Sequence, residues 1–137
     1  MSRDASLAVE CRLENLRVLA AAVRRIATPI LGAVATDQLD VALTELCSNI
    51  IRHGHRNRPS AMLHVGVRGH ADRVEVELRD QGPAFIAEPP AMPSVEVALE
   101  DLPEGGFGLA IVAATMDEFA QRRDGDTNVT RIVKRRP

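Results

Sequence analysis

Aromatic side chains are scarce in this chain of 137 residues, which contains no Tyr or Trp and only three Phe. Surfaces that bind single-stranded nucleic acid combine stacked aromatic rings with a basic groove. The formal charge of −2 provides no excess of basic side chains for such a groove. Composition and charge therefore argue against direct binding to nucleic acid.

Basic residues are missing from the middle of the chain. Residues 80–121 contain no Lys, Arg or His, so the rest of the chain carries a formal charge of +6. The stretch holds eight acidic residues, which are Asp80, Glu88, Glu96, Glu100, Asp101, Glu104, Asp117 and Glu118. An anion bound near it needs backbone amides, a metal ion or groups from elsewhere in the chain. A Walker A loop is excluded, because the only lysine, Lys134, is far from any glycine-rich stretch.

Cysteines and long apolar runs are also few. Cys11 and Cys47 lie in apolar contexts without metal-ligand spacing, which favours small buried side chains in a reducing compartment over a disulfide framework. No run approaches the roughly 18 apolar residues of a membrane span, and the N-terminus lacks a signal-peptide pattern. We expect a cytoplasmic protein without a membrane segment. Length and 45% hydrophobic content predict a single domain, 1–137.

Alternating apolar residues predict strands in five segments. The segments are 6–13, 61–68, 73–80, 118–123 and 128–135. In the first three segments, the residues predicted to face the core are Leu7, Val9, Cys11, Leu63, Val65, Val67, Val74, Val76 and Leu78. Turns at 69–72 and 124–127 suit hairpins between neighbouring strands.

A first helix is predicted after the first strand. It begins at Glu14 or Asn15 and ends near Ala27, because Pro29 disfavours a helical conformation in the residue before it. Apolar residues at helical spacing give it one buried face.

Two more helices follow from periodicity. One has Thr36 or Asp37 as its N-cap, continues to about His53 and has Gly54 as its C-cap. Its buried face consists of Leu39, Ala42, Leu43, Leu46, Cys47, Ile50 and Ile51. The other, opened by glycines, lies within 106–119 and offers Leu109, Ile111, Val112 and Met116 for burial.

These elements predict one α/β domain with an antiparallel or mixed sheet and helices on one face. Residues 81–106 lie between the third predicted strand and the last predicted helix. They contain five prolines and little periodicity, apart from a possible short helix at 95–99. A stretch of this length in a compact domain is usually a functional lid, a binding loop or a disordered segment.

Glu45, Asn49 and His53 lie four residues apart in the segment TELCSNIIRHG, residues 44–54. A helix turns once in about 3.6 residues, so the three side chains form a row beside the buried face. A carboxylate can act as a general base, and an amide oxygen suits Mg²⁺. From spacing alone, the alternative is a partly exposed polar stripe on an amphipathic helix.

Two other segments have the composition of ligand-binding loops. In DQGP, Asp80 ends a strand and can accept a hydrogen bond from a ligand amino group, while Gly82 lets a ligand approach the backbone. An ordinary turn has the same pattern. In EGGFGLAIV, residues 104–112, glycines precede an apolar helix whose first amides can bind phosphate.

The segments ELCSNIIRHG, DQGPAF and EGGFGLAIVAATMDEF resemble, in this order, the N box, the Asp-x-Gly box and the glycine-rich box of the GHKL ATPase superfamily. Their spacing fits the anti-sigma-factor serine/threonine kinases of bacterial partner-switching systems. The resemblance covers essentially the whole chain. It implies a Bergerat-type ATP-binding fold, which is a two-layer α/β (α+β) sandwich with a mixed, mostly antiparallel sheet, helices on one face and an ATP lid at about 83–105.

The resemblance also implies roles for single residues. Glu45 matches the catalytic base, and Asn49 matches the ligand of Mg²⁺. Asp80 matches the aspartate that pairs with the adenine amino group, with Gly82 beside it. The remaining ATP-binding positions are His53, Gly54, Gly105, Gly106, Phe107, Gly108 and Leu109, of which Gly106 and Gly108 match phosphate-contacting glycines.

The implied reaction transfers the γ-phosphoryl group of ATP to a serine or threonine of a STAS-domain anti-anti-sigma protein. Free of this antagonist, the protein would sequester a sigma factor, and a homodimer is expected. One alternative is a nucleotide-binding but catalytically weak module that sequesters a partner. Another is the catalytic domain of a sensor histidine kinase, which normally follows a phosphoacceptor helical hairpin that 1–137 does not contain.

Three segments depart from the family pattern. Pro103 and Glu104 stand where relatives often have a basic lid residue, and Ala84 stands where many have a second glycine. The usual Gly-Thr near the last strand is replaced by TNVT, so neither Thr127 nor Thr130 is assigned a ligand role. All three departures affect the phosphate end of the site, which favours nucleotide binding over kinase activity.

Overall fold

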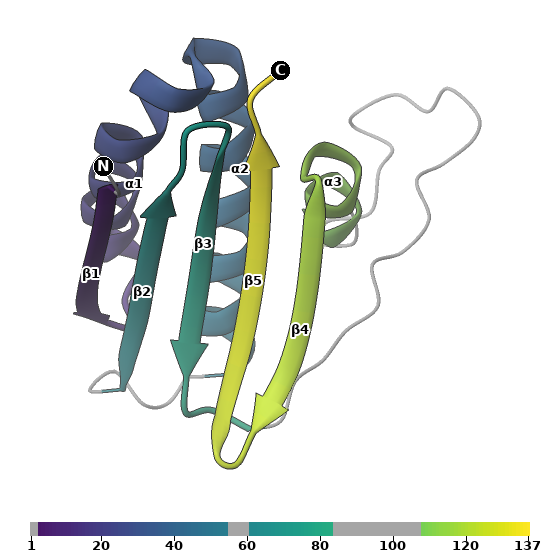
Figure 1. The fold of residues 1–137 in the computed structure, drawn as a ribbon. Coiled ribbons are helices and arrows are strands. Elements are labelled where there is room, and N and C mark those ends of the chain that lie inside the picture. Colours follow the sequence, from purple (N-terminus) through teal and green to yellow (C-terminus); the bar gives the residue numbers. More distant parts are fainter. Residues whose placement is uncertain (1–2, 55–60, 84–107) are drawn as a thin grey trace, which may run out of the picture.

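The computed structural model describes residues 3–54, 61–83 and 108–137, and its centre is a five-stranded sheet (Figure 1). The strand order is β1-β2-β3-β5-β4, and all described neighbours are antiparallel. The strands are β1 Arg3–Glu10, β2 Met62–Gly69, β3 Arg73–Asp80, β4 Glu118–Asp124 and β5 Thr127–Arg135. The predicted α/β (α+β) fold is confirmed, although the described strands include no parallel pair.

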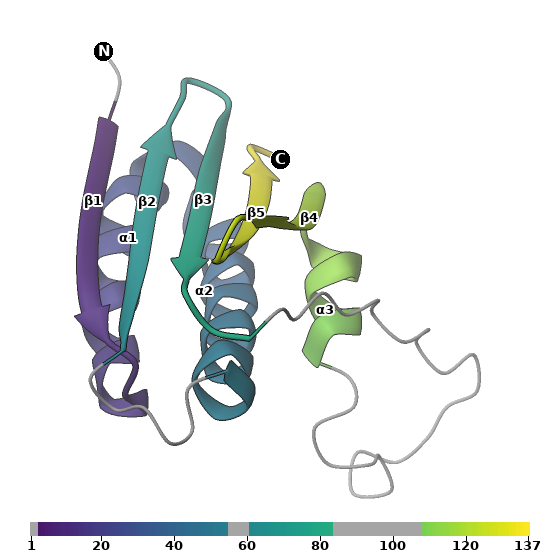
Figure 2. The same ribbon diagram turned by 90° about the horizontal axis from the view of Figure 1, so that it is seen from below.

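Two long helices cover one face of the sheet (Figures 1 and 2). α1 Leu16–Leu31 packs against α2 Ala33–Asn49 and contacts β1, β2 and β3. The shorter α3 Gly108–Thr115 packs against α2 and contacts β4. The prediction of helices on one face is confirmed, and no described helix lies on the other.

The core lies between the sheet and these helices. All the predicted inward residues of β2 and β3 are buried, and on α2 the side chains of Leu39, Leu43 and Leu46 are buried against them. Burial of such apolar side chains is the main favourable term in folding. The periodicity in the sequence therefore identified this part of the core correctly, whereas Leu7 and Val9 of β1 are only partly buried and pack against it.

Both cysteines belong to this core, as predicted. Cys11 follows β1, Cys47 lies on α2, and both are buried and outside any disulfide. Desolvation, together with the nearby Cys11, raises the pKa of the Cys47 thiol to about 12. Because the thiolate is the reactive form, Cys47 acts as a small apolar side chain at neutral pH.

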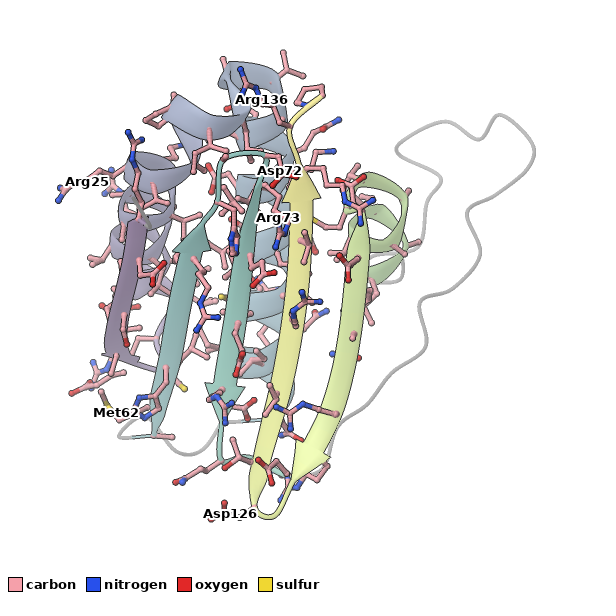
Figure 3. The ribbon with its side chains drawn as sticks, in the orientation of Figure 1. Arg25, Met62, Asp72, Arg73, Asp126 and Arg136 are labelled. Carbon is pink, nitrogen blue, oxygen red and sulfur yellow. The ribbon has the colours of Figure 1, made fainter. Side chains whose placement is uncertain are left out.

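α1 extends farther than the sequence predicted. A 3₁₀ turn, Leu13–Asn15, leads into it, and the helix continues through Pro29 to Leu31. Proline has no N–H to donate to the carbonyl of Arg25, four residues earlier. Arg25 is exposed and points away from the sheet (Figure 3), so water can bond that carbonyl. The predicted end before Pro29 is wrong because the lost hydrogen bond lies on the solvent side.

α2 begins earlier than predicted, with Gly32 as its N-cap in place of Thr36 or Asp37. Gly32 has φ 81° and ψ 176°, a backbone conformation that is essentially restricted to glycine. Its N–H donates to the carbonyl of Thr28 at 3.0 Å, and its carbonyl accepts the N–H of Thr36 at 3.1 Å. One glycine thus ends the first helix and begins the second.

The end of α2 changes helix type. Ile50–Gly54 follows Asn49 as a π-helical segment, and such segments are frequent at functional sites. The α-helical spacing behind the predicted row of Glu45, Asn49 and His53 therefore holds only as far as Asn49. The helical backbone includes Gly54, which had been expected as a C-cap after a helix ending at about His53. The side chain of His53 lies outside the described part.

Both predicted hairpins are confirmed by the antiparallel pairs β2–β3 and β4–β5. The predicted lid at 83–105 and the helical spacing at 95–99 lie outside the described residues, except for Pro83. Among the helices described, none combines the length and the apolar character needed to cross a membrane.

Candidate functional site

Buried polar side chains gather at one corner of the protein. Among the described residues, the buried polar or charged ones are Thr36, Asp80, Asn128 and Thr130. Three of them lie where β3 and β5 pair, with Asp80 opposite Asn128 and Leu78 opposite Thr130. A few polar groups that converge in an otherwise apolar region are typical of small-molecule sites.

A small pocket opens at this corner between α2, α3 and the strands. Its described lining residues are Leu46, Asn49, Ile50, Asp80, Pro83, Leu109, Gln121, Asn128 and Thr130. The fold thereby brings together three predicted site residues, Asn49, Asp80 and Leu109, from three separate elements.

Asp80 is the one charged residue among these lining residues, and it is only 3% exposed. Its Oδ2 accepts the backbone N–H of Gly82 at 3.0 Å and the Nδ2–H of Asn128 at 3.3 Å. Hydrogen bonds to a carboxylate are stronger than those between neutral groups. The two donors hold Asp80 at the pocket wall as an acceptor, which is what a ligand amino group requires.

Glu45 lies one helical turn before Asn49 and faces the start of α3. A methyl group at Gly108 would overlap Oε2 of Glu45 and come within 3.1 Å of its Cδ. The half-buried carboxylate therefore packs directly against the glycine and lies beside the N-terminus of α3. The predicted base and the predicted phosphate-binding helix are neighbours.

A sequence profile of the histidine kinase-like ATPase domain matches residues 9–134. The chain belongs to the histidine kinase-like ATPase family. Its curated relatives include the serine-protein kinase RsbW of Oceanobacillus iheyensis, which is 32% identical over 60% of this chain and 54% of the relative. RsbW of Bacillus subtilis is 30% identical over 66% of this chain and 60% of the relative. This histidine kinase-like ATPase chain thus spans between half and two-thirds of their length.

A solved structure supports the fold of this histidine kinase-like ATPase. It is the crystal structure of the RsbU and RsbW domains of Rv1364c from Mycobacterium tuberculosis, with a TM-score of 0.64 at 15% sequence identity. The similarity covers 98% of this chain and 33% of that chain. At this identity it shows the fold alone.

Other predicted site residues of the histidine kinase-like ATPase lie at the limits of the described chain. Gly108 is the first residue of α3, and the backbone of His53 and Gly54 ends the π-helical segment. Gly105, Gly106 and Phe107 lie outside the described residues.

Some lining residues were not predicted from the sequence. Asn128 and Gln121 had no predicted role, Pro83 was expected only as the start of the lid, and Thr130 was assigned no ligand role. The sequence of β5 does contain a signal for a polar site. Asn128 and Thr130 lie on the same face of the strand as the buried Ile132, so two polar side chains occupy positions where apolar ones are expected. Which residues lie beside Asn128 and Thr130 depends on which strand pairs with β5, and periodicity does not predict that pairing.

Thr127 has a different environment from Thr130. It lies at the β4–β5 turn, where its hydroxyl donates to Oδ1 of Asp126 at 3.0 Å. Asp126 marks the tip of this hairpin in Figure 3. Of the two threonines, only Thr130 lines the pocket.

Proposed function

We propose that this histidine kinase-like ATPase is an ATP-dependent serine/threonine protein kinase that also acts as an anti-sigma factor. The main supporting observation is the buried polar corner of Asp80, Asn128 and Thr130 in a small, partly apolar pocket. A pocket of this composition suits an adenine ring with an exocyclic amino donor. Similarity to the serine-protein kinases RsbW favours the protein-kinase branch of the family.

ATP fits the residues present, because the pocket combines the buried acceptor Asp80 with apolar side chains. Asp80 would accept a hydrogen bond from the adenine amino group, and the apolar side chains of Ile50 and Leu109 would contact the ring. The start of α3 at Gly108 would offer backbone N–H groups to the phosphates. The predicted lid at about 83–105 would cover the nucleotide within a single domain, 1–137.

Mg²⁺ fits Asn49, because an amide oxygen is a hard ligand and Mg²⁺ usually combines few protein ligands with substrate phosphates. When bound, the ion would neutralise phosphate charge in a site to which residues 80–121 contribute no basic side chain. Asn49 lies on the pocket wall one turn after Glu45, which is consistent with this role.

Glu45 would act as the general base. Its carboxylate would accept the proton of the attacking hydroxyl while oxygen bonds to the γ-phosphorus and the bond to the bridging oxygen of ADP breaks. Phosphoryl transfer needs mainly positioning and neutralisation of charge. The contact with Gly108 supports this assignment, because it keeps the carboxylate beside the N-terminus of α3.

We assign a STAS-domain anti-anti-sigma protein as the acceptor and a sigma factor as the partner that is sequestered. The protein would act in the cytoplasm as a homodimer. Support comes from the order and spacing of the three sequence boxes and from the relatives named RsbW.

The test is transfer of labelled γ-phosphate from ATP-Mg²⁺ to a cognate STAS protein. The wild-type protein should label a serine or threonine. Glu45→Gln should slow transfer by about 100-fold, because a general base contributes on this order, and should keep ATP affinity within about threefold of wild type. Glu14→Gln is the matched control, because Glu14 is an exposed glutamate far along the chain from the site. Absence of labelling would refute the kinase assignment, and equal rates for the two variants would refute the assignment of Glu45 as the general base.

A second candidate is a nucleotide-binding module that sequesters its partner without efficient catalysis. Pro103 and Glu104 favour it, because they replace the basic lid residue that often reaches the terminal phosphate in relatives. This candidate predicts that ATP changes the affinity for the sigma factor while no label reaches any STAS protein.

A further inference from the structure

Two side chains from the β4–β5 hairpin hold the corner at which β3 ends. Asn128 donates through Nδ2 to the carbonyl of Pro83 at 2.9 Å and to Oδ2 of Asp80 at 3.3 Å. Arg123 donates through Nη1 to the carbonyl of Gly82 at 2.8 Å and to Oδ1 of Asn128 at 3.0 Å. Together they bond to Asp80, Gly82 and Pro83, and the bonded residues are separated by 41 to 48 residues of chain.

We propose that Arg123 is a positioning residue for nucleotide-base recognition, acting through Asn128 and the carbonyl of Gly82 on the carboxylate of Asp80. This inference rests on the proposed function, in which Asp80 accepts the adenine amino group. It extends the site by a residue that is not among the described lining residues of the pocket. The hydrogen bonds of Arg123 and Asn128 to residues 80–83 form the Arg123 clamp.

The orientation of the Asn128 amide is fixed from both sides. Its Nδ2 faces two acceptors, and its Oδ1 faces the guanidinium of Arg123. A flipped amide would put donors against the guanidinium and an oxygen against the carboxylate of Asp80. Arg123 therefore ensures that Asn128 presents a donor to Asp80, and Asp80 keeps one orientation at the pocket wall.

The guanidinium is suited to this role because it donates in several directions from one rigid plane. While Nη1 bonds to Gly82 and Asn128, Nε donates to the carbonyl of Gly125 at 3.0 Å, which anchors the side chain to its own hairpin. A lysine has a single ammonium group and cannot reproduce this fork. Arg123→Lys should therefore behave more like Arg123→Gln than like the wild type.

The neighbouring Arg122 provides a matched control. Consecutive strand residues point to opposite faces of a sheet, and the ion pair recorded for Arg122 is to the exposed Asp124 at 3.7 Å. Arg122→Gln removes the same charge from the same strand, one residue away, without altering the clamp.

The test compares ATP and GTP affinities of wild type, Arg123→Gln, Arg123→Lys and Arg122→Gln by titration calorimetry. Arg123→Gln should weaken ATP by about tenfold, the scale of one or two lost hydrogen bonds, and GTP by much less, so that the preference for ATP shrinks. Arg122→Gln should match wild type. A purely structural role would weaken both nucleotides equally, and that result, or an unchanged ATP affinity for Arg123→Gln, would overturn the proposal.

A nucleotide-free measurement separates the clamp from the proposed function. In NMR spectra of the free protein, the side-chain amide of Asn128 should show hydrogen-bonded shifts in wild type and Arg122→Gln, and should move toward the shifts of a free amide in Arg123→Gln. Unmoved signals would overturn the clamp. Failure of the wild type to bind ATP while these signals move as expected would instead refute the proposed function and leave the clamp as a fact of the fold.

Discussion

Glu45 and Gly108 bring the two helices of the site into direct contact. The carboxylate occupies the space that any larger residue at 108 would need. The sequence predicts that Gly108 contacts phosphate. The contact with Glu45 is a second feature that favours glycine at this position. A hydrogen at this position leaves room for the Glu45 carboxylate beside the start of α3.

Gly108→Ala should therefore displace the Glu45 carboxylate. We expect phosphoryl transfer to the STAS protein to slow by at least about tenfold, a fraction of what loss of a general base costs. The fold should be retained, because the overlap falls on the end of a flexible side chain and alanine is the better helix former. Transfer rates and thermal unfolding measure the two effects.

Gly66→Ala is the control for this change. Gly66 lies in β2, and a methyl group there has no atom within 4 Å. Equal transfer rates for Gly108→Ala and Gly66→Ala would show that the position of Glu45 does not depend on the glycine.

How far a site residue could be predicted depended on whether its partners are local. Asn49 and Asp80 stand in short motifs whose composition is visible in one stretch, and both line the pocket. Asn128 contacts Asp80 from 48 residues away, and only the pairing of β3 with β5 creates that contact. Arg123 could not be predicted from the sequence either, because its bond to Gly82 joins residues 41 positions apart.

Among the elements, the β4–β5 hairpin contributes Gln121, Asn128 and Thr130 to the pocket lining. It also carries Arg123 of the clamp. Its turn contains Gly125, whose φ of 61° lies in the left-handed region. Glycine adopts this conformation without strain. Asparagine and aspartate tolerate it better than other residues do. The carbonyl of Gly125 also accepts the Nε–H of Arg123, so the turn anchors one residue of the clamp.

Gly125→Ala should lower the free energy of unfolding by about 1 kcal/mol, the usual cost of a left-handed alanine. Gly125→Asn should lower it by less, because asparagine tolerates this conformation. Denaturant unfolding of the two variants measures the difference. Equal losses, or none, would show that the turn relaxes to another conformation.

Element positions were predictable where periodicity was strong, and element ends were not. The alternation of Val74, Val76 and Leu78 identified β3 correctly. The start of α2 was misplaced because Thr36 has the composition of an N-cap, whereas the backbone of Gly32 performs that role. Local composition does not reveal whether a residue lies before or inside the first turn.

For the whole molecule, the two faces of the sheet have different chemistry. One carries the apolar core and the site, and the other carries charged side chains that pair across strands. Arg131 bonds to Glu75 and Glu118, both at 3.1 Å. Desolvation raises the pKa of Glu75, but the hydrogen bond and charge of Arg131, aided by His70 and Arg73, outweigh it and leave the pKa below its ordinary value. The pair therefore stabilises the fold at neutral pH and is lost as acid protonates Glu75 through that lowered pKa.

The layered α/β fold was predictable from the order and periodicity of the elements, and the strand order was not. Sequence neighbours β2 and β3 pair as expected, but β5 lies between β3 and β4 and so brings Asn128 to Asp80. This arrangement creates the pocket. The central proposal, that ATP binds there with its adenine at Asp80, follows from it.

Titration calorimetry of wild type and Asp80→Asn with ATP and GTP tests this proposal most directly. Asp80→Asn replaces one acceptor oxygen by a donor nitrogen with little change in shape. Asp72→Asn serves as the control, because Asp72 is an exposed residue of the β2–β3 turn (Figure 3). We expect the wild type and Asp72→Asn to bind ATP at least about tenfold more tightly than GTP, and Asp80→Asn to lose about tenfold or more of its ATP affinity. Equal ATP affinities for Asp80→Asn and wild type, or no ATP binding by the wild type, would refute the assignment of this pocket to ATP.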